Sequence, residues 1–277
     1  MQQVTIQSTV QMEIYLNNGN IVHKVINKDN KEKRMEAKFL KRLSDYKYAL
    51  VCDLAQYESG FALLDVSTNA LIEVQQISVS RTTDQPTGEM YQMFDEMVND
   101  FLDRYSLHAE DLIIIKEQLP INCGPHSTAQ TLQALAAAHA VFNINTYLRK
   151  LYTYSNGIHS ISVKTYFKKL LGIEKPQKDD IRAAVCKYYD IDPESITRDE
   201  SDAIALWFCL RGAKWNKDID DQIKLEKKHR KTLTANHAIK DVDNEIERLE
   251  GLKWDEQQFT TQISLKLGLQ SVSQTDN

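Results

Sequence analysis

Several features that would assign this sequence to common functional classes are scarce or missing. Its four cysteines contain no C-x-x-C pair, so we do not expect a zinc site. Nine glycines form no glycine-rich phosphate loop, which an actin-like nucleotide-binding protein would need. There is no signal peptide and no run that approaches the roughly 20 apolar residues of a membrane span. We therefore expect a cytoplasmic protein.

An excess of positive charge is also missing. The 34 Lys and Arg residues are outnumbered by 39 Asp and Glu residues, which gives a net charge of -5 and does not indicate a nucleic-acid binder. Residues 146–190 depart from this average, because they contain nine basic and only four acidic residues. Such a segment suits phosphate binding, although lysines on a solvated helix face would give the same count.

The sequence predicts three parts. Residues 1–46 form an N-terminal extension, with a β-hairpin that turns at Asn17-Asn18-Gly19-Asn20 and a short helix or linker after it. Residues 47–212 form the main domain. Residues 213–277 form a charged helical tail, in which apolar residues recur every three or four positions.

The main domain shows a mixed pattern of strands and helices. We expect strands at 47–54, 60–66, 70–79, 111–117 and 158–163, and helices at 88–105, 127–151, 178–189 and 198–212. Three antiparallel-type strands followed by alternating helices and strands predict an α/β fold. The expected architecture is a mixed five-stranded sheet flanked by helices.

Two carboxylates stand where apolar strands end. Asp53 follows Leu50-Val51-Cys52, and Glu117 follows Leu112-Ile113-Ile114-Ile115 with one lysine between. Each would also fit a solvated residue at the edge of a sheet, since aspartate is common where strands end. Neither residue alone establishes a site.

The start of a later helix carries two more carboxylates. Thr197 and Glu200 fit a capping box, so the helix should begin at Arg198. Asp199 and Asp202 then lie three residues apart on one helical face. Simple N-terminal capping explains one acidic residue, but Asp202 directly precedes the apolar run 203–208. A second carboxylate at that position indicates a further role.

Four carboxylates on apolar elements would repel one another unless cations neutralise them. Mg²⁺ is the natural candidate because it prefers oxygen ligands and bridges carboxylates to phosphates. Two such ions roughly 4 Å apart can activate a water and stabilise the leaving oxygen of a phosphodiester. The chemistry expected of this set is hydrolysis of a nucleic-acid backbone.

Taken in order, these motifs resemble those of the RuvC family of Holliday-junction resolvases, which have a ribonuclease H-like core. Asp53 lies seven positions before Gly60, Glu117-Gln118 ends the fourth strand, and Asp199-Glu200-Ser201-Asp202-Ala203 opens a helix. The resemblance covers residues 48–212. It implies a Mg²⁺-dependent endonuclease (Mn²⁺ substituting) that acts in DNA recombination and repair. The implied catalytic and metal ligands are Asp53, Glu117, Asp199 and Asp202, with two ions per site.

The resemblance extends to basic residues and to quaternary structure. The segments 162–164, 168–172 and 175–181 match the family's lysine-bearing strand, glycine-containing loop and following helix. They imply DNA-binding roles for Lys164, Lys168, Lys169, Lys175 and Lys178. A homodimer making paired nicks in a four-way DNA junction is also implied. Leu54-Ala55 departs from the family, which has proline-glycine there.

Two other functions fit the same residues. Another ribonuclease H-like nuclease, acting on other branched DNA or on an RNA/DNA hybrid, would use a similar set of carboxylates. A protein that binds junctions without cutting them would share the basic segment. Substrate profiling separates the three.

Overall fold

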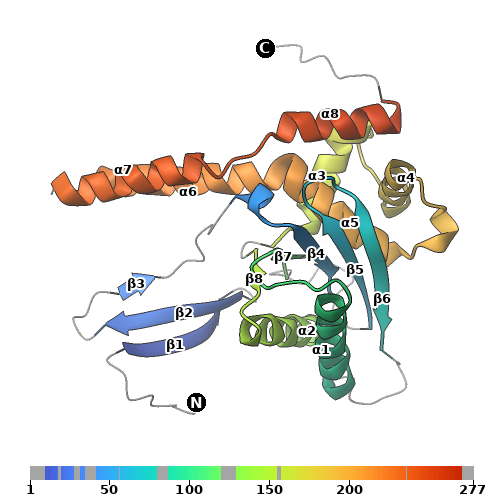
Figure 1. Ribbon diagram of the computed structural model, residues 1–277, viewed down its shortest axis with the longest axis horizontal. Coiled ribbons are helices and arrows are strands. Elements are labelled where there is room, and N and C mark those ends of the chain that lie inside the picture. Colours follow the sequence, from blue (N-terminus) through green and yellow to red (C-terminus); the bar gives the residue numbers. More distant parts are fainter. Residues whose placement is uncertain are drawn as a thin grey trace.

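A five-stranded mixed sheet lies at the centre of the protein (Figure 1). The computed structural model describes residues 10–17, 20–27, 32–34, 42–55, 57–79, 87–119, 129–154, 157–234 and 236–269. The strand order is β6-β5-β4-β7-β8, with bounds Leu71–Ser78, Glu58–Asp65, Tyr48–Asp53, Leu112–Lys116 and Tyr152–Thr153. β4, β5 and β6 pair antiparallel, whereas β7 is parallel to β4 and β8 is parallel to β7. This is the ribonuclease H-like arrangement, and the predicted fold class is confirmed.

Both faces of the sheet are covered by helices, which explains the continuous apolar runs in its strands. On β4, Leu50 and Cys52 belong to one buried cluster, and Ala49 and Val51 belong to the other. Helices α1 (Thr87–Arg104) and α2 (Ala129–Leu148) cover the first face. The second face is covered by α3, α4 and α5, with bounds Ser160–Leu171, Lys178–Tyr189 and Arg198–Cys209.

The predicted strand at 158–163 is wrong. Ile158 forms a single parallel bridge with Glu117, and the chain then enters α3 at Ser160. The buried residues of α3 are spaced as one helical stripe: Val163, Tyr166, Phe167 and Leu170. Ile161, Ser162 and Val163 alternate apolar and polar, as in a half-buried strand, and only the following residues reveal the helical spacing.

The N-terminal hairpin is confirmed as a pair of strands. β1 (Val10–Asn17) and β2 (Asn20–Asn27) are antiparallel, with Asn17 opposite Asn20. A third strand, β3 (Glu32–Arg34), was not predicted. A short 3-10 turn, η1 (Leu43–Asp45), precedes β4, while residues 28–31 and 35–41 of the expected helix or linker lie outside the described part.

The helical tail begins as a continuation of α5. A π-helical turn, η3 (Leu210–Lys214), joins α5 to α6 (Trp215–Arg230), and α7 (Asn236–Glu250) and α8 (Glu256–Leu267) follow. Trp215, Phe259 and Ile263 belong to the same buried cluster as β4 and α5, so the tail packs onto the main domain. Among the described helices, none is both long and apolar enough to cross a bilayer.

A backbone contact fixes the start of α5 against the sheet. Gly60 on β5 lies so close to Asp199 that a Cβ atom at Gly60 would overlap the Asp199 carbonyl group. Glycine is the residue that permits such an approach, because it has no side chain. The contact sets the distance between the sheet edge and the first turn of α5.

We expect Gly60→Ala to lower the free energy of unfolding by about 1–3 kcal/mol, because overpacking against backbone forces α5 to shift. Gly88→Ala is the matched control, since a Cβ atom added at Gly88, near the start of α1, would have no neighbouring atom within 4 Å. It should stay within about 0.5 kcal/mol of the wild type. Urea unfolding measures both, and equal stabilities of the two variants would contradict the close contact.

Candidate metal site

Asp53 and Glu117 meet at one edge of the sheet. Asp53 is the last residue of β4, and Glu117 directly follows β7. The two strands are parallel, so their carboxyl ends lie side by side, and the Glu117 N–H donates to the Cys52 carbonyl at 3.1 Å. The two carboxyl groups share a side-chain hydrogen bond. Such a bond requires a proton on one of the two groups, because ionised carboxylates only accept.

The capping box at the start of α5 is confirmed and presents two further carboxylates to this edge. The Glu200 N–H donates to the Thr197 hydroxyl at 3.2 Å, and the Thr197 N–H donates to the Glu200 carboxylate at 2.7 Å. This fixes the start of α5, which carries Asp199 in its first turn and Asp202 at the beginning of its second. Gln76 on β6 donates to the Asp199 carboxylate at 3.4 Å and helps to orient it.

The structure brings these carboxylates into one cluster. Asp53, Asp199 and Asp202 each offer an oxygen, and the three oxygens lie within 4.8 Å of one another. Glu117 joins the cluster through its hydrogen bond with Asp53, and the charge of Asp202 raises the pKa of Glu117. Clustered carboxylate oxygens of this kind are the ligands that a hard divalent cation prefers. The residues present therefore fit a Mg²⁺ or Mn²⁺ ion.

Burial and mutual repulsion change the acidity of the cluster. Burial raises the pKa of Asp53 well above its usual range, and the charges of Glu117 and Asp202 raise it further. Burial also raises the pKa of Glu117, although the hydrogen bond from Asp53 and the charge of Lys178 act in the opposite direction. The pKa of Asp199 is raised chiefly by burial. The cluster therefore retains protons that a bound cation would displace.

The positively charged side chain of Lys178 contacts the cluster. Lys178 is the first residue of α4 and forms an ion pair with Asp202. Burial lowers its pKa, but the hydrogen bond and charge of Asp202, with Asp53 and Asp199 nearby, outweigh that effect and raise it overall. Its side chain is 61% exposed, so the ammonium group remains accessible to a ligand.

The other predicted DNA-binding lysines form no ion pair with the four carboxylates. Lys164, Lys168 and Lys169 are exposed on α3, and Lys175 is exposed in the segment before α4. Lys164 was predicted to lie on a strand, but it lies on the helix α3. A DNA-binding role for these lysines stays a prediction.

Sequence reasoning missed three polar residues near the cluster. Gln76 donates a hydrogen bond to Asp199, and the charge of Glu58 raises the pKa of Asp199. His159, at the start of α3, lowers the pKa of Glu117. The histidines show no metal-ligand spacing, and His159 is 42 positions away from Glu117 in the sequence. No local pattern marks Gln76 or Glu58, since strand pairing alone brings them to this edge.

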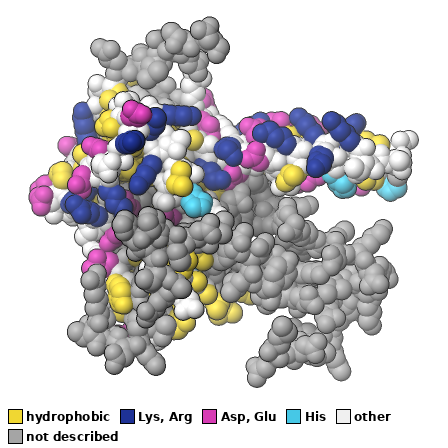
Figure 2. All heavy atoms as spheres, turned by 180° about the vertical axis from the view of Figure 1, so that it is seen from behind, with side chains coloured by type: hydrophobic (Ala, Val, Ile, Leu, Met, Phe, Trp, Pro, Cys, Tyr) yellow, Lys and Arg dark blue, Asp and Glu magenta, His cyan; other side chains and the backbone are white. Residues whose placement is uncertain are grey.

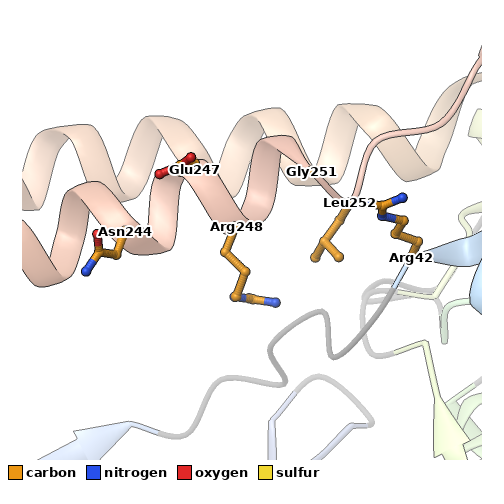
Figure 3. Close-up of a pocket in the computed structure, with 6 residues that line it drawn as sticks. All are labelled: Arg42, Asn244, Glu247, Arg248, Gly251 and Leu252. Carbon is orange, nitrogen blue, oxygen red and sulfur yellow. The ribbon is translucent and has the colours of Figure 1, made fainter.

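A shallow pocket of about 430 Å³ lies at the other end of β4 (Figure 3). The side chains of Arg42 and Arg248 point into the space below α7, and the full lining is Arg42, Asn244, Glu247, Arg248, Gly251 and Leu252. Arg42 precedes the first residue of β4, whereas Asp53 is the last residue of that strand. The pocket is therefore separate from the carboxylate cluster.

No model of a protein family and no curated protein sequence matches this chain. Two solved structures of RuvC from Thermus thermophilus resemble it, each with a TM-score of 0.44. Each match covers 61% of this chain and 95% of the RuvC chain. One, in complex with a Holliday junction substrate, is 12% identical, and the other is 14% identical. At these values the similarity concerns the fold alone.

We expect Asp53→Asn to raise the melting temperature of the metal-free protein, because it removes a partly buried carboxyl group whose ionised form is repelled by its neighbours. It should also abolish stabilisation by Mg²⁺. For the wild type, a Mg²⁺ concentration of 100 times the Kd adds about 2.7 kcal/mol to the free energy of unfolding. Each kcal/mol raises the melting temperature of a chain of this size by about 2–4 °C.

Asp103→Asn is the matched control for this experiment, since Asp103 is exposed near the end of α1, which precedes β7, whereas Glu117 follows that strand. Its melting temperature should rise with Mg²⁺ as in the wild type. Differential scanning fluorimetry with and without Mg²⁺ measures all three proteins. An Asp53→Asn protein that Mg²⁺ still stabilises fully would remove Asp53 from the site.

Acidity should control metal binding in a definite direction. Because the folded-state pKa values of Asp53, Glu117 and Asp199 are raised, Mn²⁺ must displace protons, and its affinity should fall as the pH decreases toward those values. The fall should begin above the ordinary carboxylate range of about 3.9–4.3. Without metal the sign is opposite: the folded state holds more protons than the unfolded state, so stability should decrease as the pH rises through the raised pKa values.

Isothermal titration calorimetry with Mn²⁺, in two buffers of different ionisation enthalpy, counts the protons released. A pH-independent affinity with no proton release between pH 5 and about 7.5 would contradict the raised pKa values of the cluster.

Proposed function

We propose that this protein is a divalent-metal-dependent DNA endonuclease that hydrolyses phosphodiesters in four-way DNA junctions. The observation that carries the proposal is the cluster of Asp53, Asp199 and Asp202, joined by Glu117, at the edge of a ribonuclease H-like sheet. Partly buried carboxylates that repel one another are unfavourable for folding unless a ligand compensates. A metal-bound phosphodiester is the ligand that best fits their charge and position.

The four carboxylates would hold two Mg²⁺ ions, with Mn²⁺ as a substitute. When bound, such ions activate a water and stabilise the leaving oxygen of an in-line displacement. Gln76 orients the Asp199 carboxylate through its hydrogen bond. The capping box between Thr197 and Glu200 keeps the first turn of α5 in place while charge changes nearby.

Lys178 has a role of its own in this proposal. In the metal-free protein its ammonium group neutralises Asp202. Once a cation takes over that task, the exposed ammonium group is free to contact a substrate phosphate. Its position at the start of α4 places it on the side of the cluster that faces solvent.

The choice of DNA as substrate is supported by basic residues near the site. Residues 146–190 carry nine basic and four acidic residues in a chain of net charge -5. We assign phosphate contacts to Lys164, Lys168, Lys169, Lys175 and Lys178, since phosphate contacts supply much of the affinity for DNA. The four-way junction, the homodimer and the paired nicks follow from the sequence resemblance to the RuvC family and are part of the same proposal.

We expect the wild type to cut a synthetic four-way junction with Mg²⁺ or Mn²⁺ and not with EDTA. Asp202→Asn should lower the cleavage rate roughly 100-fold or more, because metal stabilisation of the transition state is worth several kcal/mol and each 1.36 kcal/mol is tenfold in rate. Junction binding should survive in this variant, and Asp103→Asn should cut normally.

One gel with a four-way junction, a flap, a linear duplex and an RNA/DNA hybrid makes the measurement. Selective cutting of the hybrid would favour a different ribonuclease H-like nuclease. Junction binding by the wild type without any cutting would favour a non-cleaving binding protein. Full activity of Asp202→Asn would remove that residue from the mechanism.

A further inference from the structure

A helical arm projects from the main domain, away from the sheet (Figure 1). α5, the π turn η3 and α6 follow one another without a break from Arg198 to Arg230, and α7 returns alongside α6. The candidate metal site lies at the start of this helical run, and the tip of the arm lies at its end. At 1.5 Å per residue the two are at most about 50 Å apart.

Only the inner half of the arm is packed. Trp215, Ile219 and Ile223 of α6 are buried in the main core, and Tyr154 donates a hydrogen bond to Asp218. Beyond Ile223, none of the described residues between 224 and 241 is buried. The outer half therefore contributes little to the core and is available to a partner.

The outer half is also strongly basic. We define the basic arm tip as residues 224–240, which contain six Lys and Arg residues and one acidic residue in a chain of net charge -5. Four of its lysines are exposed and form no ion pair with any residue that the structure describes: Lys227, Lys228, Lys231 and Lys240. Figure 2 shows Lys and Arg side chains gathered along the projecting arm.

Helix stability does not account for this charge. Lysines in the last turn of α6 suit the negative end of its dipole. The first turn of α7 lies at the same tip, however, where negative charge is favoured, and it has no acidic residue. Lys240 follows directly in α7 and places a positive charge near the positive end of that helix. A positively charged tip thus has an electrostatic cost that a polyanionic partner would offset.

We propose that the basic arm tip binds the phosphate backbone of a duplex arm of the branched DNA substrate, remote from the cleaved bond. This inference rests on the proposed function and extends it to a second DNA contact. A spacing of at most about 50 Å corresponds to about 15 base pairs at 3.4 Å each. An arm of about 25 base pairs is therefore long enough to reach the tip, whereas an arm of about 8 base pairs covers only about half of that limit.

The test is a variant in which these four lysines become glutamine: Lys227→Gln, Lys228→Gln, Lys231→Gln and Lys240→Gln. Fluorescence anisotropy, in Ca²⁺ and over a range of salt concentrations, measures its binding to junctions with arms of about 8 and about 25 base pairs. We expect the variant to bind the long-arm junction at least about tenfold more weakly than the wild type. Its salt slope should fall by about 0.9 for each phosphate that the variant no longer neutralises, with short-arm binding unchanged.

The matched control replaces the same four lysines by arginine, which keeps the charge and should keep long-arm binding. Equal melting temperatures of all three proteins show that the exposed substitutions leave the fold intact. Unchanged long-arm affinity and salt slope in the glutamine variant would overturn the inference. So would an equal loss for short and long arms, or binding to vesicles of anionic lipid that depends on these lysines while DNA binding does not.

The two proposals fail separately. If Mg²⁺ supports no cleavage but the glutamine variant loses long-arm binding, the arm contact stands and the nuclease assignment fails. If junctions are cleaved and the glutamine variant binds them as the wild type does, the nuclease assignment stands and the arm contact fails.

Discussion

Electrostatic repulsion among carboxylates at one edge of the sheet is the constraint on which the candidate site depends. Burial raises the pKa of both Asp53 and Glu117, and the charge of Glu117 raises that of Asp53 further. Nothing in their own strands favours such an arrangement, since buried like charges destabilise a fold. The packing of the surrounding elements has to hold them together, and a divalent cation would turn that cost into binding energy.

Three local features hold the carboxylates close together. Parallel pairing of β4 with β7 aligns the ends of the two strands. The capping box of Thr197 and Glu200 fixes the first turn of α5, and the missing side chain of Gly60 lets that turn lie directly on β5. Together these contacts bring Asp53, Asp199 and Asp202 to the same place.

Acidic and basic residues lie in separate parts of the molecule, although the chain as a whole has a net charge of -5. The carboxylate cluster lies at the start of a long helical run, and the basic arm tip lies at its end. The intervening part of the arm is acidic on both helices, with Asp220 and Asp221 on α6 and Glu247 and Glu250 on α7. A polyanion would therefore be attracted to the basic arm tip and repelled by the acidic part of the arm between the tip and the cluster.

Most of the fold could be predicted from local patterns, because apolar periodicity and helix capping act over only a few residues. These patterns predicted four of the five sheet strands, the bounds of α4, and the capping box that carries Asp199 and Asp202. They failed at 158–163, where a few alternating apolar and polar residues fit a strand although the helical spacing continues beyond them. The resemblance of the motifs to a known family suggested that Asp53, Glu117, Asp199 and Asp202 act together, and the structure brings together three of them that lie up to 149 positions apart. The contacts of Lys178 with Asp202 and of Gln76 with Asp199 became visible only in three dimensions. Such contacts depend on strand pairing and helix packing, which no local pattern encodes.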